Sequence, residues 1–339
     1  MFQLKSKESV SDGIKRNVTR ELTKVLKHVD AKSKPGRKDT SQAEAAHEIR
    51  KCFKKARAAL RLVREVLGDD VYREENWCFR DAARPLTEVR DAEMLIETFE
   101  KLRSQFADQL ENALGAKVHE TMRANQNTLI RRIINEERAF LGVKEVAQRA
   151  LARVSEWGID RDGWDALEAG TRRVYRAGHR ALSLADESPS VANLHEWRKQ
   201  VKYLWHVLQL LEPAWTVSQK GLGDQFHDLS RLLGEDHDLA VLRQSLAADP
   251  LSYGGHQFLK GLFVLIDRQR KMLEQQAFRL GQQLYKDSSK IFTARLESNW
   301  RAWAAGTSGA KPEPRPSTKF DAPQRRPIIS APAKQRRNP

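Results

Sequence analysis

A run of basic side chains between residues 47 and 64 is the clearest chemical feature of the sequence. The run reads HEIRKCFKKARAALRLVR, and Glu48 is its single acid. At about 100° per residue on a helix, its cations gather on one face and its apolar side chains on the other. Like charges three or four residues apart repel, so this ladder predicts a polyanionic partner; the alternative is an ordinary solvated face. The basic members are His47, Arg50, Lys51, Lys54, Lys55, Arg57, Arg61 and Arg64.

The same pattern returns later in the chain. The matching segments are 46–54 with 194–202, 84–91 with 231–238, and 13–16 with 170–173. His47 lies 37 residues before Arg84, and His195 lies 36 residues before Arg231. Matching order and spacing at three places indicate an internal duplication. We therefore expect two basic helices, one in each half, and not one isolated ladder.

Composition restricts the kind of partner and the compartment. The 339 residues include 60 Lys+Arg and 45 Asp+Glu, a formal net charge of +15. This balance favours nucleic acid, an anionic membrane or a phosphate polymer. Cys52 and Cys78 lack the CxxC spacing, which fits a reducing cytosol and argues against a structural zinc site. Residues 1–10 have no apolar signal core, and no apolar run is long enough to span a bilayer, so we expect a soluble cytoplasmic protein.

Helices would position these cations throughout the chain. Strand-like alternation is absent, and the helical period recurs almost everywhere before residue 305. We predict an all-α fold of two pseudo-symmetric helical bundles, residues 5–157 and 163–305. The expected helices cover residues 9–28, 41–67, 71–84, a pattern from 95 to 157 with a possible break at Leu114-Gly115, and 257–303. Residues 306–339, with seven prolines and eight Lys or Arg, predict a disordered basic tail, which is either a solubilising segment or a source of weak electrostatic attraction to a polyanion.

The doubled H-x-x-R-K-x-x-K motif, at 47–54 and 195–202, resembles the CHAD family, the conserved histidine α-helical domain. The Arg90-Asp91 and His237-Asp238 pairs resemble it too, and the resemblance covers about residues 5–305. It implies a basic groove or pore between the two bundles, binding of inorganic polyphosphate and association with polyphosphate granules. Some relatives carry a triphosphate-processing domain with an E-x-E-x-K strand signature. That signature is absent here, so the chain looks like a stand-alone member.

The second ladder departs from the first, because Tyr203 stands at the counterpart of Lys55. Even so, we predict that both basic helices face one channel, widened by Arg16, Arg173 and Arg176. Arginine offers a planar fork for phosphate oxygens and lysine a mobile point charge. Besides the first ladder, the predicted polyphosphate-binding residues are Arg16, Arg90, Arg172, Arg173, Arg176, Arg180, His195, Arg198, Lys199, Lys202 and His237.

Other functions have weaker support in the sequence. Nucleic-acid binding is the main rival, since the charge fits and Tyr175, Trp197 or Trp205 could stack on bases, although no known nucleic-acid motif occurs. A metal-dependent phosphohydrolase is the next alternative, although the surrounding cations would repel a divalent ion. Its ligands would come from His47, His195, His227, Asp228, His237 and Asp238. No nucleophile motif, P-loop or membrane-surface helix is evident, so we expect a binding protein without a cofactor, not an enzyme.

Overall fold

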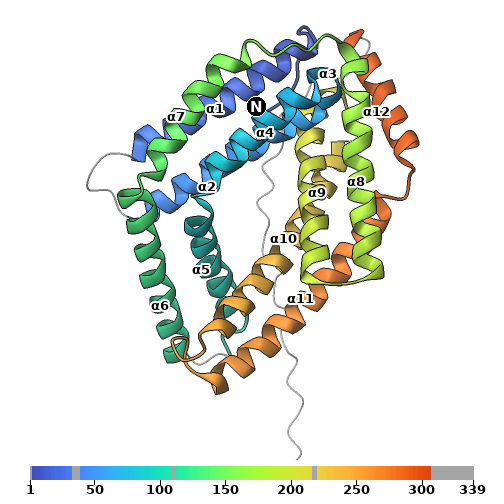
Figure 1. Ribbon diagram of the computed structural model, residues 1–339. Helices are drawn as coiled ribbons and strands as arrows, with labels where there is room; N and C mark the ends of the chain where they lie inside the picture. Colours follow the sequence, from blue (N-terminus) through green and yellow to red (C-terminus); the bar gives the residue numbers. More distant parts are fainter. Residues whose placement is uncertain (1, 33–38, 109–111, 216–219, 307–339) are drawn as a thin grey trace, which may run out of the picture. The chain divides into compact units, whose positions relative to one another are not determined.

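A computed structural model describes residues 2–32, 39–108, 112–215 and 220–306, and it consists of helices joined by turns (Figure 1). No strand occurs in this part of the chain, which confirms the all-α prediction. None of its helices is long and apolar enough to cross a membrane. The predicted tail lies outside the described residues from residue 307 onward.

Helices of unequal length make up the first half. They are α1 (Val10–Lys32), α2 (Asp39–Leu62), α3 (Arg64–Leu67), α4 (Asp69–Ala83), α5 (Thr87–Gln105), α6 (Asn112–Ile130), the π-helical turn η1 (Arg131–Glu136) and α7 (Ala139–Val154). A non-helical segment follows at residues 155–162, where a linker was predicted. The second half contains η2 (Gly163–Ala166), α8 (Glu168–Glu187), α9 (Val191–Leu211), η3 (Glu212–Ala214), α10 (Lys220–Ala248), α11 (His256–Leu284) and α12 (Ser289–Ala304).

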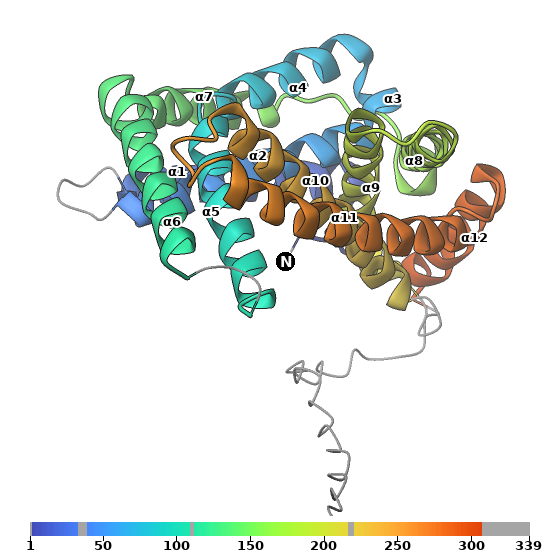
Figure 2. The same ribbon diagram turned by 90° about the horizontal axis from the view of Figure 1, so that it is seen from below.

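The helices of the two halves pack against one another in the same scheme. In the first half α1 packs against α2 and α7, and α5 packs against α6. In the second half α8 packs against α9 and α12, and α10 packs against α11. Both views place α6 and α7 on one side and α8 and α12 on the other (Figures 1 and 2). The halves meet where α2 contacts α9 and where α5 contacts α10. The duplication itself stays a prediction from the sequence.

The helices that carry the cations each have an apolar stripe that is buried in the core. Ile49 and Phe53 of α2 are buried, and Phe53 stacks on Phe79 of α4 with ring centroids 5.8 Å apart. Trp197 and Val201 occupy the same face of α9 and are fully buried. Trp197 is therefore a core residue. Burial of one stripe on each helix turns the opposite, basic stripe outward from its own bundle.

Helix boundaries differ from the sequence-based expectation in three places. The predicted helix 41–67 ends at Leu62, and the short α3 follows before Gly68, whose φ of 88° suits glycine. The expected break at Leu114-Gly115 is wrong, because both residues lie inside α6. The long pattern from 257 to 303 divides into α11 and α12, where the Ser288 side chain accepts a hydrogen bond from the Ile291 amide and caps α12.

Candidate functional site

Four cations from two helices meet where the halves contact each other. They are Arg50 and Lys54 of α2 and Arg198 and Lys202 of α9, here called the central cation cluster. Both Arg198 and Lys202 act electrostatically on Lys54 across the α2–α9 contact. The two predicted ladders therefore come together at the residues that the doubled motif has in common.

Two carboxylates accompany the central cation cluster, one from each half. Asp91 of α5 interacts with Arg50 and Lys54. Asp238 of α10 lies 3.7 Å from the Arg198 guanidinium, carboxylate oxygen to Nη2. Burial raises the pKa of both carboxyl groups, and the neighbouring cations oppose that shift. The Arg198–Asp238 contact is thus an ion pair between α9 and α10.

The two lysines of the cluster are strongly affected by their surroundings. Burial, reinforced by Arg50, Lys202 and Arg198, lowers the pKa of Lys54 to about 7. Burial and the neighbouring cations, with Arg198 first, lower the pKa of Lys202 to about 8. Each ammonium group is thus destabilised by cations that approach from more than one helix. An added polyanion would stabilise both charges.

The motif histidines lie beside the cluster as neutral rings. Ring centroids of His195 and His237 are 4.3 Å apart, with 41° between the ring planes. Burial and then Arg198 lower the pKa of His237 to about 3. Burial also lowers the pKa of His47 and of His195. Near neutral pH these rings can therefore offer hydrogen bonds to a ligand but add little positive charge.

Lys51 and Lys199 occupy equivalent places outside the central cluster. Lys51 Nζ lies 3.1 Å from a Glu48 carboxylate oxygen, and Lys199 pairs in the same way with Glu196. Both pairs span three residues along one helix. Exposed pairs of this kind are weak, so either lysine can exchange its glutamate for another anion.

The C-terminal part of the first ladder contacts the second half of the molecule. Arg61 stacks over the Tyr203 ring at 3.8 Å from its centroid, which links α2 to α9. Arg173 of α8 donates to Glu65 of α3 at 2.6 Å and to the Arg61 carbonyl oxygen. Arg57 donates to Asn76 and Arg64 to Asp69, at 3.0 and 2.7 Å. These arginines are already engaged by protein groups.

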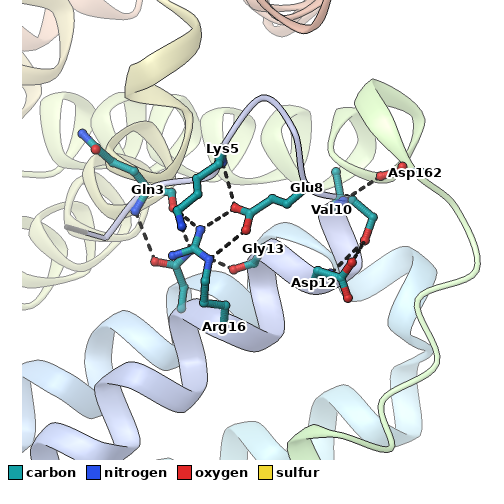
Figure 3. Close-up of polar contacts among 10 residues, drawn as sticks. Gln3, Lys5, Glu8, Val10, Asp12, Gly13, Arg16 and Asp162 are labelled. Atoms are coloured by element: carbon teal, nitrogen blue, oxygen red, sulfur yellow. Dashed lines mark hydrogen bonds and ion pairs between the residues drawn. The ribbon is translucent and has the colours of Figure 1, made fainter.

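Other predicted cations lie apart from the cluster. Arg16 donates to Glu8 and to the carbonyl oxygen of Gln3 (Figure 3). Lys55 lies over the Phe2 ring, with Nζ 5.5 Å from the centroid. Arg172 pairs with Glu168, and Arg176 and Arg180 are exposed and have no ion pair within the described part of the chain. Arg90 is the exception: it pairs with Glu97 but also acts on Arg50 and Lys202, so it lies beside the cluster.

Most protein groups that contact the cations were not predicted from the sequence. Glu48 and Glu196 restrain the outer lysines, and Arg50 is tied to the α4–α5 corner by a 3.1 Å hydrogen bond to the Ala83 carbonyl oxygen. The doubled H-E dipeptide is the signal that could have revealed the glutamates. Within the described residues, no three His, Cys, Asp or Glu side chains are arranged to hold a metal ion.

Comparison with known protein families matches residues 20–247 to the CHAD domain. The matched range contains α2, α5, α9 and α10, the four helices that supply the central cation cluster and its two aspartates. None of the curated proteins compared with the chain matches it.

Proposed function

The chain belongs to the CHAD family, and from this premise we propose that it binds inorganic polyphosphate without hydrolysing it. The observation that carries the proposal is the central cation cluster, in which Lys54 and Lys202 from opposite halves act on each other electrostatically. Polyphosphate has about one negative charge per phosphate and no bases to recognise. A site for it needs closely spaced cations and hydrogen-bond donors, which Arg50, Arg198 and the motif histidines provide.

Polyphosphate suits the site better than nucleic acid does. The aromatic side chains suggested for base stacking are committed elsewhere, since Trp197 and Tyr175 are fully buried. Trp205 is half-buried against the core and contacts the His206 and His227 rings. A ligand that offers phosphates alone therefore matches the groups at the cluster. We further propose that the protein acts in the cytoplasm on polyphosphate granules.

Competition binding tests the ligand class. The full chain is incubated with labelled long-chain polyphosphate on filters at moderate salt, and double-stranded DNA or RNA is added at equal phosphate concentration. We expect unlabelled polyphosphate to compete much better than either nucleic acid. Equal competition by DNA or RNA would replace polyphosphate by nucleic acid as the ligand. Release of phosphate from polyphosphate with Mg²⁺ or Mn²⁺ present would show that the protein is an enzyme.

Charge reversal tests the place of binding. The variant Lys51→Glu with Lys54→Glu spares Arg50, which holds α2 to its neighbours. Loss of two contacts between phosphate and charged donors, at ~1.5–3 kcal/mol each, predicts at least about a hundredfold weaker binding. The matched control is Lys117→Glu with Lys290→Glu, two exposed lysines of α6 and α12. Equal losses in the two variants would show that net charge, not the cluster, governs binding.

A further inference from the structure

Lys54 and Lys202 differ from Lys51 and Lys199 because no carboxylate within the described residues pairs with them. Within the described residues, neither Nζ forms an ion pair, whereas Lys51 and Lys199 each pair with a glutamate of their own helix. Lys202 instead lies over the Trp205 ring, with Nζ 5.5 Å from the centroid. The two lysines are thus positive groups without a direct counter-charge, one from each half.

The charged groups that face each lysine come from several helices, and around both lysines most of them are cations. Around Lys54 are Arg50 of α2, Arg198 and Lys202 of α9, and Asp91 of α5. The His195 and His237 rings of α9 and α10 also lie within electrostatic reach of Lys54. The groups that act on Lys202 are Arg198 of α9, Lys51 of α2, Arg90 of α5 and Asp238 of α10. Cations therefore outnumber carboxylates among the strongest influences on each ammonium group.

Lysine and arginine respond differently to such an excess of positive charge. A guanidinium stays protonated in proteins, whereas a lysine ammonium can lose its proton when it is buried among cations. The free protein can therefore relieve the repulsion only at Lys54 and Lys202. Burial and the neighbouring cations accordingly lower their pKa values to about 7 and about 8. A bound polyanion would reverse the balance of charge and make the protonated forms favourable again.

We propose that Lys54 and Lys202 take up protons when polyphosphate binds between them, so that binding is coupled to proton uptake. This inference rests on the proposed function and adds a pH dependence to the same site. Affinity falls as the pH rises from about 7 to about 9, since the free protein loses the charges that the ligand needs. The histidines contribute mainly at lower pH, because the pKa values of His47, His195 and His237 are all lowered.

Calorimetry measures the coupling directly. Long-chain polyphosphate is titrated into the full chain at pH 8, at one ionic strength, in buffers whose ionisation enthalpies differ. The slope of the observed enthalpy against the buffer's ionisation enthalpy is the number of protons taken up. Protein atoms surround the Lys54 ammonium group, but part of the side chain stays exposed. Water therefore screens part of the repulsion, and we expect uptake of about one proton for the two lysines together.

The decisive variant is Lys54→Arg with Lys202→Arg, which keeps both charges and removes both titrating ammonium groups. We expect the slope to fall to near zero and the affinity at pH 8 to exceed that of the wild type. The matched control, Lys51→Arg with Lys199→Arg, changes the paired lysines of the same helices and should keep the wild-type slope. Equal slopes in the wild type and the decisive variant, or a zero slope in the wild type, would overturn the inference.

A failure of the proposed function has a different signature. Absence of any binding isotherm removes the function and the inference together, whereas a normal isotherm with no buffer dependence removes the inference alone. Acylation of the free protein at pH 8 gives an independent readout, because only the neutral amine reacts. Lys54 and Lys202 should be modified faster than Lys51 and Lys199, and polyphosphate should protect them. Equal modification of the four lysines would also contradict the inference.

Discussion

Asp91 and Asp238 place two carboxylates beside the central cation cluster, so the site does not consist of cations alone. Each carboxylate acts on cations of the central cluster, Asp91 on Lys54 and Asp238 on Lys202. In the free protein they stabilise these cations, and in the proposed complex they would repel the phosphates. They therefore limit the affinity while they keep the unoccupied cluster folded, because charges gathered without counter-ions would destabilise it.

Replacing either carboxylate should tighten binding. Asp91→Asn and Asp238→Asn each remove one negative charge from the site while they keep a similar shape. A repulsion of ~1 kcal/mol between partly screened charges predicts about fivefold higher affinity for polyphosphate. Filter binding at constant salt measures the change. Asp30→Asn is the control, since Asp30 pairs with Lys144 on the α1–α7 surface. Weaker binding by both cluster variants would show that the carboxylates organise the site more than they oppose the ligand.

His206 makes folding depend on pH independently of the ligand. It lies one turn after Lys202 in α9, but its side chain is buried, with Nδ1 3.0 Å from the Gln209 side-chain oxygen. Burial lowers its pKa from the ordinary 6.5 to about 3. The unfolded chain therefore binds more protons than the folded protein between these values. The stabilisation is complete above pH 6.5 and is lost as the pH falls toward 3.

From this linkage we expect His206 to lower the free energy of unfolding by ~2 kcal/mol between pH 7 and pH 5. Urea denaturation at the two pH values measures the loss. The variant His206→Met keeps an apolar side chain of similar size and cannot titrate. Its pH-dependent loss should be smaller than that of the wild type by about this amount. An identical loss in the two proteins would rule out His206 as the source.

At the scale of helices, the contact between α8 and α2 depends on one glycine. A Cβ atom at Gly170 would lie 1.9 Å from the backbone oxygen of Leu62. Backbone atoms cannot move aside as a flexible side chain can, so any larger residue must push α8 away from the end of α2. This crossing lies next to the Arg173–Glu65 pair that connects the two halves.

Gly170→Ala should therefore destabilise the protein by ~2 kcal/mol, the usual range for overpacking in a tight contact. Gly142→Ala in α7 is a matched control, because nothing lies within 4 Å of the added Cβ atom. There the better helix propensity of alanine predicts a gain of up to ~1 kcal/mol. Thermal unfolding of the two variants should shift the midpoint in opposite directions. A stable Gly170→Ala protein would mean that the helices separate at little cost.

The sequence was sufficient for the helices and for the residues that form the cluster, but not for the partners of each cation. Periodicity predicted the buried faces of α2 and α9, because burial of a stripe at helical spacing is a local property of the chain. Whether a cation is free depends on residues distant in sequence. Arg61 stacks on Tyr203, and Arg173 bonds to Glu65, 108 residues earlier. Arg16 pairs with Glu8 in a segment before α1, where no helical period applies.

At the scale of the whole molecule, the site exists only where the halves meet. The central cation cluster takes Arg50 and Lys54 from the first half and Arg198 and Lys202 from the second. The Arg61–Tyr203 and Arg173–Glu65 contacts cross between the same halves. The longer ladder of α2 would suggest that the first half dominates binding. The geometry favours equal contributions, since each half places one unpaired lysine in the cluster.

Salt dependence distinguishes these two possibilities. The slope of log K against log salt is negative, and for a single-stranded polyanion its magnitude falls by ~1.4 when two cations that contact phosphates are removed. The variants Lys51→Gln with Lys54→Gln and Lys199→Gln with Lys202→Gln remove equivalent motif positions from α2 and α9. A shared site predicts equal reductions in slope and in affinity for the two variants, whereas a site on the α2 ladder predicts a reduction only in the first.

A third variant, Arg176→Gln with Arg180→Gln, removes the same charge from the exposed face of α8, outside the cluster. It controls for the general attraction between a chain of net charge +15 and any polyanion. We expect its slope to change by less than half as much as the slopes of the cluster variants. Equal changes in the three variants would mean that the ligand contacts a broad basic surface. In that case the convergence of the two motifs would serve folding and not recognition.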